Sequence, residues 1–185
     1  MLGFGIGNYY GVAGAIFYIL AHSLAKGLLF LTSGSVVHAT GTCNMKKLAG
    51  LGERMSTTSW SFKIGGLSLI GIPPLVGFFA KLFIIIGAIQ AGFIWIAMIA
   101  ILLSGVTLAY LLKIETNVFM KKGKIDAKAA PFTMRIAMVF LVVLIVLMGV
   151  GFQPIMDFII GPAAHALLRG LEYANLVFGP FTTNF

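Results

Sequence analysis

Four apolar stretches, each long enough to cross a bilayer, constrain this sequence more than any other feature. They run over residues 11–38, 57–90, 92–112 and 132–151. A helix needs about 20 apolar residues to span the hydrocarbon core of a membrane. The composition agrees, because 59% of the 185 residues are hydrophobic and only 10% are charged. We therefore predict an all-α integral membrane protein with four transmembrane helices, and we exclude soluble globular and disordered proteins.

The basic residues concentrate in two loops between these stretches. Residues 39–56 hold three Lys or Arg and one Glu, and residues 113–135 hold six Lys or Arg and two acids. Short basic clusters between apolar runs are typical of membrane topology rather than of a nucleic-acid-binding surface, so we expect no nucleic-acid partner. By the positive-inside rule, both loops are expected in the cytoplasm and both termini outside.

The chain divides into a predicted transmembrane half-bundle, residues 1–152, and an amphipathic C-terminal segment, residues 153–185. Pro154 and the Gly161–Pro162 pair are expected to end the apolar run. A helix over residues 163–178 would follow, lying in the membrane interface or against a partner. Its polar face would hold His165, Arg169 and Glu172. Residues 1–10 are too short to span and look like the end of a helix.

Two lysines lie inside the apolar stretches, where contact with lipid is costly. Lys26 is near the middle of the first stretch and Lys81 is in the second, and each would cost about 2.5–3.5 kcal/mol at the bilayer centre. His22 lies one turn before Lys26 on the same helix face, so the two side chains could pass a proton between them. The alternative is an ion pair between Lys26 and a carboxylate of a partner chain, because no acid of this chain lies at that depth.

The second apolar stretch is predicted to contain a broken helix. Pro73 and Pro74 have no N–H to donate to the carbonyls of Leu69 and Ile70, and each disfavours a helical conformation of the residue before it. Freed backbone groups at membrane depth must be buried in protein or line a wet cavity, an arrangement that ion transporters use. The predicted hinge residues are Gly71, Pro73, Pro74 and Gly77. Lys81 follows the break and could carry a proton; the alternative is a simple proline kink.

Two further residues are accessory candidates, and one residue limits the chemistry. Lys63 lies near the expected cytoplasmic end of the second stretch, from which its ammonium can extend to the surface. His38 ends the first stretch off the face that carries His22, so a capping or interface role is the simpler interpretation.

Cys43 is the only cysteine, which excludes an internal disulfide and a CxxC metal site. We therefore expect no metal and no cofactor in this chain.

Several motifs together resemble a known family. Residues 21–31 read AHSLAKGLLFL, residues 38–42 read HATGT, residues 48–51 read LAGL and residues 71–81 read GIPPLVGFFAK. They resemble the antiporter-like subunits shared by respiratory complex I, Mrp-type cation/proton antiporters and membrane-bound hydrogenases. The resemblance covers roughly residues 5–120 and corresponds to the second of the two inverted helix bundles of these subunits.

The resemblance implies that the chain helps to move protons or sodium ions along buried ionisable residues. His22 and Lys26 match the central relay of the family, and Lys81 matches the ionisable residue of its broken helix. Two alternatives stay open: a structural or docking half-subunit without its own pathway, and a small independent channel that oligomerises. The cost of burying two lysines favours the transporter.

The resemblance also implies partners. Family members are more than twice this length and carry a first bundle. Either another chain supplies that bundle, which is the partner we expect, or this chain is a half-copy. Other membrane subunits and peripheral redox subunits are expected around it in a prokaryotic cell membrane. Iron–sulfur clusters, a Ni–Fe centre or flavin would then lie on those peripheral subunits, which would make this chain part of a membrane-bound oxidoreductase such as a hydrogenase-like complex.

Overall fold

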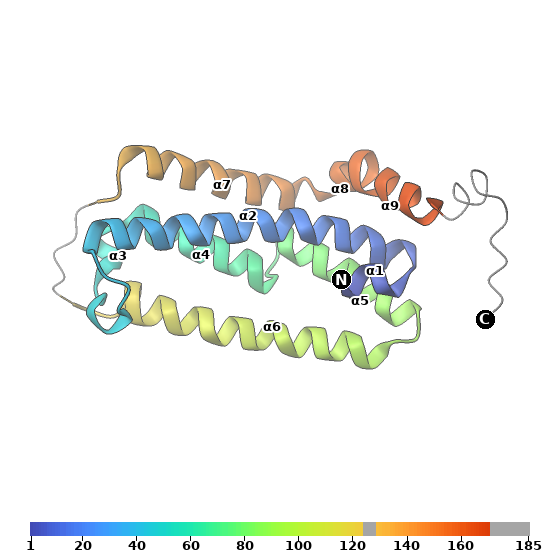
Figure 1. Cartoon of the computed structure of the whole chain (residues 1–185), viewed down its shortest axis with the longest axis horizontal. Coiled ribbons are helices and arrows are strands. Elements are labelled where there is room, and N and C mark those ends of the chain that lie inside the picture. The colour runs from blue at the N-terminus through green and yellow to red at the C-terminus, as the bar shows by residue number, and fades with distance from the viewer. Residues whose placement is uncertain (124–128, 171–185) are drawn as a thin grey trace.

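The computed structural model describes residues 1–123 and 129–170, which fold into an elongated bundle of helices (Figure 1). Within these residues the chain contains no strand. The α-helices are α1 (Leu2–Ile6), α2 (Tyr9–Thr40), α3 (Leu51–Arg54), α4 (Ser56–Ile70), α5 (Val76–Gln90), α6 (Ile94–Glu115), α7 (Phe132–Val150), α8 (Phe152–Ile155) and α9 (Gly161–Leu168). A 3₁₀ turn, η1 (Met45–Lys47), precedes α3, and two π-helical turns, η2 (Thr116–Met120) and η3 (Met156–Ile160), follow α6 and α8.

Three helical segments of the described chain are long and apolar enough to cross a membrane: Tyr9–Thr40, Ile94–Met120 and Phe132–Val150. They correspond to the first, third and fourth apolar stretches of the sequence. The second stretch forms α4 and α5, which have 15 residues each, or about 22 Å of helix apiece. The all-helical, membrane-type fold is therefore confirmed, whereas the count of four spans stays a prediction.

The second stretch is interrupted where its two prolines lie. Helix α4 ends at Ile70, and Gly71 adopts a left-handed conformation with φ 91° and ψ 53°. The N–H of Ile72 donates to the carbonyl of Leu67 at 3.1 Å, which closes the end of α4. Pro73 and Pro74 follow, and α5 begins at Val76. The chain thus leaves α4 and starts α5 within five residues, in the middle of the bundle (Figure 1).

Close backbone contact through glycines fixes α5 against α2. A Cβ atom added to Gly14 would lie 2.7 Å from the backbone nitrogen of Ile84, and one added to Gly87 would lie 2.5 Å from that of Gly11. Real Cβ atoms do not approach so closely, so the absence of side chains sets the helix separation. Gly14 faces Ile84 and Gly11 faces Gly87, which means that the two helices run antiparallel.

The C-terminal part of the described chain differs from the sequence expectation. Helical structure does not end at Pro154 or at the Gly161–Pro162 pair but continues from Phe152 to Leu168. Both prolines lie in the first turn of a new helical segment, where a missing N–H costs little. The bend falls instead at Gly151, between α7 and α8. Residues 171–178 of the expected amphipathic helix lie outside the described residues.

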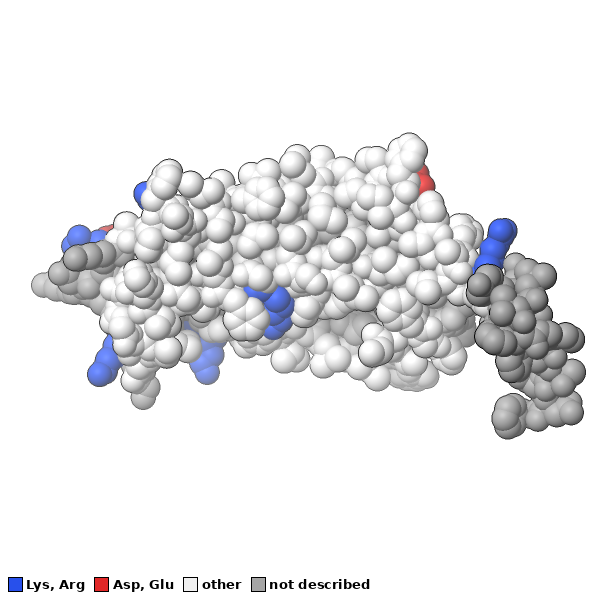
Figure 2. Space-filling model, turned by 45° about the horizontal axis from the view of Figure 1, so that its top comes forward, with Lys and Arg blue, Asp and Glu red and all other residues white. Residues whose placement is uncertain are grey.

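The two basic loops lie at the same end of the bundle. Figure 1 shows α3, the start of α4, the end of α6 and the start of α7 together at one end, and the end of α5 and α9 at the other. The described parts of the two loops also touch, because a Cβ atom on Gly50 would meet the backbone of Gly123 at 2.6 Å. On the face in Figure 2, blue atoms are most numerous at this end, and one further blue group lies near the middle of an otherwise uncharged central surface. The structure therefore places both basic loops on one side of any membrane that the bundle crosses.

Candidate functional site

Lys81 is the best-defined polar group inside the bundle. Its Nζ donates to the carbonyl of Ile70 at 2.9 Å and to Oγ of Ser104 at 2.9 Å. The side chain comes from the second turn of α5 and reaches back past the break, where its Cδ would lie 3.1 Å from a Cβ atom on Gly71. Lys81 therefore occupies the interruption between α4 and α5 and is held there by neutral oxygen atoms.

The helix break creates one of these two oxygen acceptors. In an unbroken helix the carbonyl of Ile70 would accept the N–H of residue 74, but Pro74 has none. The freed carbonyl accepts from the Lys81 ammonium instead. The second acceptor is the hydroxyl of Ser104 on α6, which also donates to the carbonyl of Ala100 at 3.1 Å. The ammonium thus satisfies a backbone group that would otherwise be unpaired at depth.

A cavity of about 290 Å³ adjoins this ammonium. Its lining includes Tyr18 of α2, Lys81 of α5, and Ser104 and Thr107 of α6, together with apolar residues from α1, α2, α5 and α6. This volume is several times the roughly 30 Å³ that one water molecule occupies in the liquid. The site is therefore a mostly apolar pocket whose lining includes one ammonium and three hydroxyl groups.

His22 and Lys26 lie further along α2 from this pocket. Extending the antiparallel register of α2 and α5 sets Lys81 level with Phe17 and Tyr18, about one turn from His22. The rings of Tyr18 and His22 are 5.4 Å apart. Nδ1 of His22 is buried without a hydrogen-bond partner. Tyr18 thus lines the same cavity as Lys81, and His22 and Lys26 follow Tyr18 at four-residue intervals along α2.

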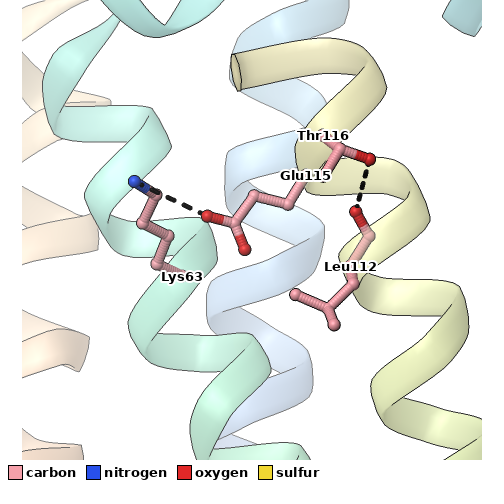
Figure 3. A network of polar contacts seen from close by, with 4 residues as sticks. All are labelled: Lys63, Leu112, Glu115 and Thr116. Atoms are coloured by element: carbon pink, nitrogen blue, oxygen red, sulfur yellow. Dashed lines mark hydrogen bonds and ion pairs between the residues drawn. The ribbon is translucent and has the colours of Figure 1, made fainter. Parts of the chain in front are cut away.

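The two accessory candidates lie away from this row. His38 is exposed in the last turn of α2, more than four turns from His22 along that helix. Lys63 of α4 forms an ion pair with Glu115 of α6, with Nζ and Oε1 3.5 Å apart (Figure 3). The described residues form no other ion pair. No described acid therefore pairs with Lys26 or Lys81.

Sequence reasoning did not find Ser104, Thr107 or Glu115. A signal for the first two exists, because they are polar residues three positions apart in the very apolar stretch 92–112. Such hydroxyl groups often bond only to their own helix, as Thr107 does with the carbonyl of Leu103 at 2.9 Å. Contact between Ser104 and Lys81 depends on how α5 and α6 pack, which the spacing does not contain.

Metal ligands are not grouped in the residues that the structure describes: no three His, Cys, Asp or Glu side chains lie close enough to hold an ion. The polar groups named around Lys81 are hydroxyl, carbonyl and ammonium groups. What this arrangement offers chemically is a half-buried amine that can hold or release a proton next to space for water.

Comparisons with known proteins identify the family of this chain. The family described as NADH:quinone oxidoreductase/Mrp antiporter, TM, matches residues 1–107. A subunit of the Na(+)/H(+) antiporter of Alkalihalophilus pseudofirmus is 35% identical over 161 residues, which cover 85% of this chain and 33% of that relative. The chain therefore spans about a third of the length of that relative.

Two solved structures contain a similar chain. A chain of the Mrp complex from Dietzia sp. DQ12-45-1b superposes with a TM-score of 0.87 and 26% identity, covering 96% of this chain and 41% of that one. A chain of respiratory complex I from Thermus thermophilus with bound NADH superposes with a TM-score of 0.81 and 28% identity, covering 91% and 36%. Since the family matches more than half of its residues, the chain belongs to the NADH:quinone oxidoreductase/Mrp antiporter transmembrane family.

Proposed function

We propose that this chain is an ion-translocating part of a multi-subunit membrane complex and that Lys81, His22 and Lys26 relay protons across its middle. The observation that carries the proposal is the position of Lys81, whose ammonium fills a helix break beside a cavity with room for water. The relatives named above belong to an antiporter and to respiratory complex I, and both assemblies are the kind of complex in which we place this chain. The transported ion is a proton, a sodium ion or both.

The relay would work by loss and gain of one proton at each group. Release from the Lys81 Nζ leaves a neutral amine, which no longer needs both of its oxygen acceptors. Water in the adjoining cavity would carry the proton along Tyr18 to the free Nδ1 of His22, and from there to Lys26. A charge is costly in the dry interior of a bundle, so the extra proton would pass through the chain rather than stay on one group.

A purely structural role for the same chain is the second candidate. A structural role does not explain why Lys26 and Lys81 are present, because each adds about 2.5–3.5 kcal/mol to the cost of insertion at the bilayer centre. Filling space does not require ionisable groups. We therefore favour translocation over a docking role, and we place any redox cofactors on partner subunits.

Lys26→Met tests the relay directly. We expect coupled proton movement in native membrane vesicles to fall by about a hundredfold or more, as for loss of a proton-transfer group. A pH-sensitive acridine dye reports the gradient, and mass spectrometry of the affinity-tagged chain shows whether the same subunits still co-purify. Lys47→Met, which removes an exposed lysine of η1, is the matched control. Wild-type transport by Lys26→Met in an intact complex would remove Lys26 from the pathway.

The orientation of the bundle is also a proposal: the end with the basic loops faces the cytoplasm. Cys43 is exposed in the first of these loops and is the only cysteine of the chain. A membrane-impermeant maleimide should therefore label it in everted vesicles and not in intact cells, with detergent-denatured protein as the positive control. Labelling in intact cells alone would reverse the proposed topology.

A further inference from the structure

The seam between α4 and α6 carries two polar sites, and the relay proposed above uses only one of them. Lys63 of α4 lies opposite Glu115 of α6. Two turns further along α4, the Lys81 ammonium donates both to the carbonyl of Ile70 on α4 and to the hydroxyl of Ser104 on α6. Lys63 and Ile70 are seven residues apart, which is about 10 Å along a helix. Both sites therefore face the same seam at different depths.

The Lys63–Glu115 pair is only partly shielded. The side chain of Lys63 is 30% exposed and that of Glu115 is 17% exposed. Figure 3 shows the two side chains reaching toward one another from α4 and α6, while the neighbouring Thr116 bonds to the carbonyl of Leu112 in its own helix at 2.8 Å. The Lys63 ammonium also lies 4.8 Å from the ring centre of Trp60, a distance at which a cation is attracted to the ring face.

A second cavity extends from Lys63 toward the basic end of the bundle. It has a volume of about 340 Å³, and its lining includes Glu53, Ser56, Ser59, Trp60 and Lys63. Glu53 and Trp60 are exposed, so the cavity reaches the surface next to α3. Lys63 therefore lies between a polar cavity on one side and Glu115 on the other.

An apolar layer separates this pair from the Lys81 site. Leu111 of α6 is 5% exposed, and its Cδ1 would lie 3.7 Å from a Cβ atom on Gly66 of α4. Gly66 lies between Lys63 and Ile70 on the same face of α4. Leu111 thus lies between the polar groups at the two ends of the seam, where it would block free flow of water while leaving a short distance for a proton to cross.

We propose that Lys63 and Glu115 form the port through which protons pass between the basic end of the bundle and Lys81; this port rests on the relay proposed above. An incoming proton binds a carboxylate oxygen of Glu115, which neutralises the carboxylate and frees the Lys63 ammonium from the ion pair. The proton then leaves Glu115 toward Lys81 when Leu111 moves away from Gly66 and water bridges the seam. Return of the bare carboxylate restores the ion pair and closes the cycle.

Two variants of the full chain in its native complex test the port. Glu115→Gln keeps the size and hydrogen-bonding shape of the side chain but cannot take up a proton. The double variant Lys63→Met with Glu115→Met replaces the pair by apolar groups of similar volume, a change that buried ion pairs often tolerate. We expect both to lower proton movement by about tenfold or more while the same subunits co-purify. Asp157→Asn, an exposed acid in η3, is the control and should transport normally.

A purely structural pair gives a different result. If α4 and α6 need only be held together, the double methionine variant transports at the wild-type rate, and the port is wrong. The relay itself is tested separately by Lys81→Arg, because arginine keeps the charge but does not release its proton. Loss of transport in Lys81→Arg with normal transport in both port variants would overturn the port alone, whereas normal transport in Lys81→Arg would overturn the relay.

Discussion

Lys81→Ala is expected to abolish coupled ion movement and to leave the complex assembled. The substitution removes the amine that the Ile70 carbonyl and Ser104 hold at the helix break. Two opposing effects on stability are then comparable in size. Leaving a buried acceptor unpaired costs about 1–3 kcal/mol, while removing a charge from the bilayer centre saves about 2.5–3.5 kcal/mol. Assembly should survive, so the measured loss reports on transport.

Lys81→Arg separates the charge of this side chain from its proton. Arginine retains a cation and donors for the same two oxygens, but it stays protonated in proteins. A relay group must give up its proton, so we expect Lys81→Arg to be as inactive as Lys81→Ala. Dye-detected proton movement in vesicles, normalised to the amount of assembled complex, is the measurement. Normal transport by the arginine variant would mean that Lys81 acts only as a structural cation.

Removing one of the oxygen acceptors should give an intermediate result in the same assay. Ser104→Ala leaves the Lys81 ammonium with the Ile70 carbonyl alone, which changes the position and proton affinity of the amine without removing it. Thr107→Val is the matched control, because Thr107 lines the same cavity but bonds to the carbonyl of Leu103 in its own helix. A graded order of Lys81→Ala, Ser104→Ala and Thr107→Val, from most to least impaired, follows from these contacts.

The break itself was predictable because proline chemistry is local. Pro73 and Pro74 lack an N–H wherever they occur, so the sequence alone shows that two carbonyls lose their partners. The identity of the replacement donor is not local. Lys81 lies 11 positions from Ile70 and reaches its carbonyl only because α5 folds back beside the end of α4.

Other features required the packing of helices to be known. Gly14 and Gly105 both lie in apolar stretches of the sequence. A Cβ atom added to Gly14 would lie 2.7 Å from the backbone nitrogen of Ile84, whereas one added to Gly105 would have no neighbour within 4 Å. Glu115 was counted among the loop charges, because its position at the end of α6 became meaningful only once Lys63 was placed opposite it. His22 and Lys26, predicted from their spacing, share one helix whatever the packing, and their role remains a proposal.

Gly77→Ala is expected to destabilise the complex more than any other single-methyl change near the break. A Cβ atom at this position would overlap the backbone carbonyl of Ser68, the residue two before the end of α4. Backbone atoms cannot move aside as a flexible side chain can, so α4 and α5 would have to separate. Overpacking of this kind costs about 3 kcal/mol. The measurement is the thermal unfolding midpoint of the purified complex in detergent.

Gly105→Ala is the matched control for the methyl group. It lies within α6 with nothing inside 4 Å of an added Cβ atom, and replacing an open helical glycine by alanine adds about 0.5–1 kcal/mol of stability. The two alanine variants should therefore shift the unfolding midpoint in opposite directions. Equal midpoints for both variants would contradict the close contact between Gly77 and Ser68.

Comparison with a distant glycine distinguishes lost stability from a displaced site. Gly123→Ala would also overlap a backbone carbonyl, that of Ala49, but at the basic end and far from the helix break. Both variants should unfold earlier than the wild type. Gly77→Ala should in addition lose transport at temperatures where it is still folded, because Lys81 lies one turn further along the same half-helix and moves with it. Equal transport by the two folded variants would show that the position of α5 relative to α4 does not control the Lys81 site.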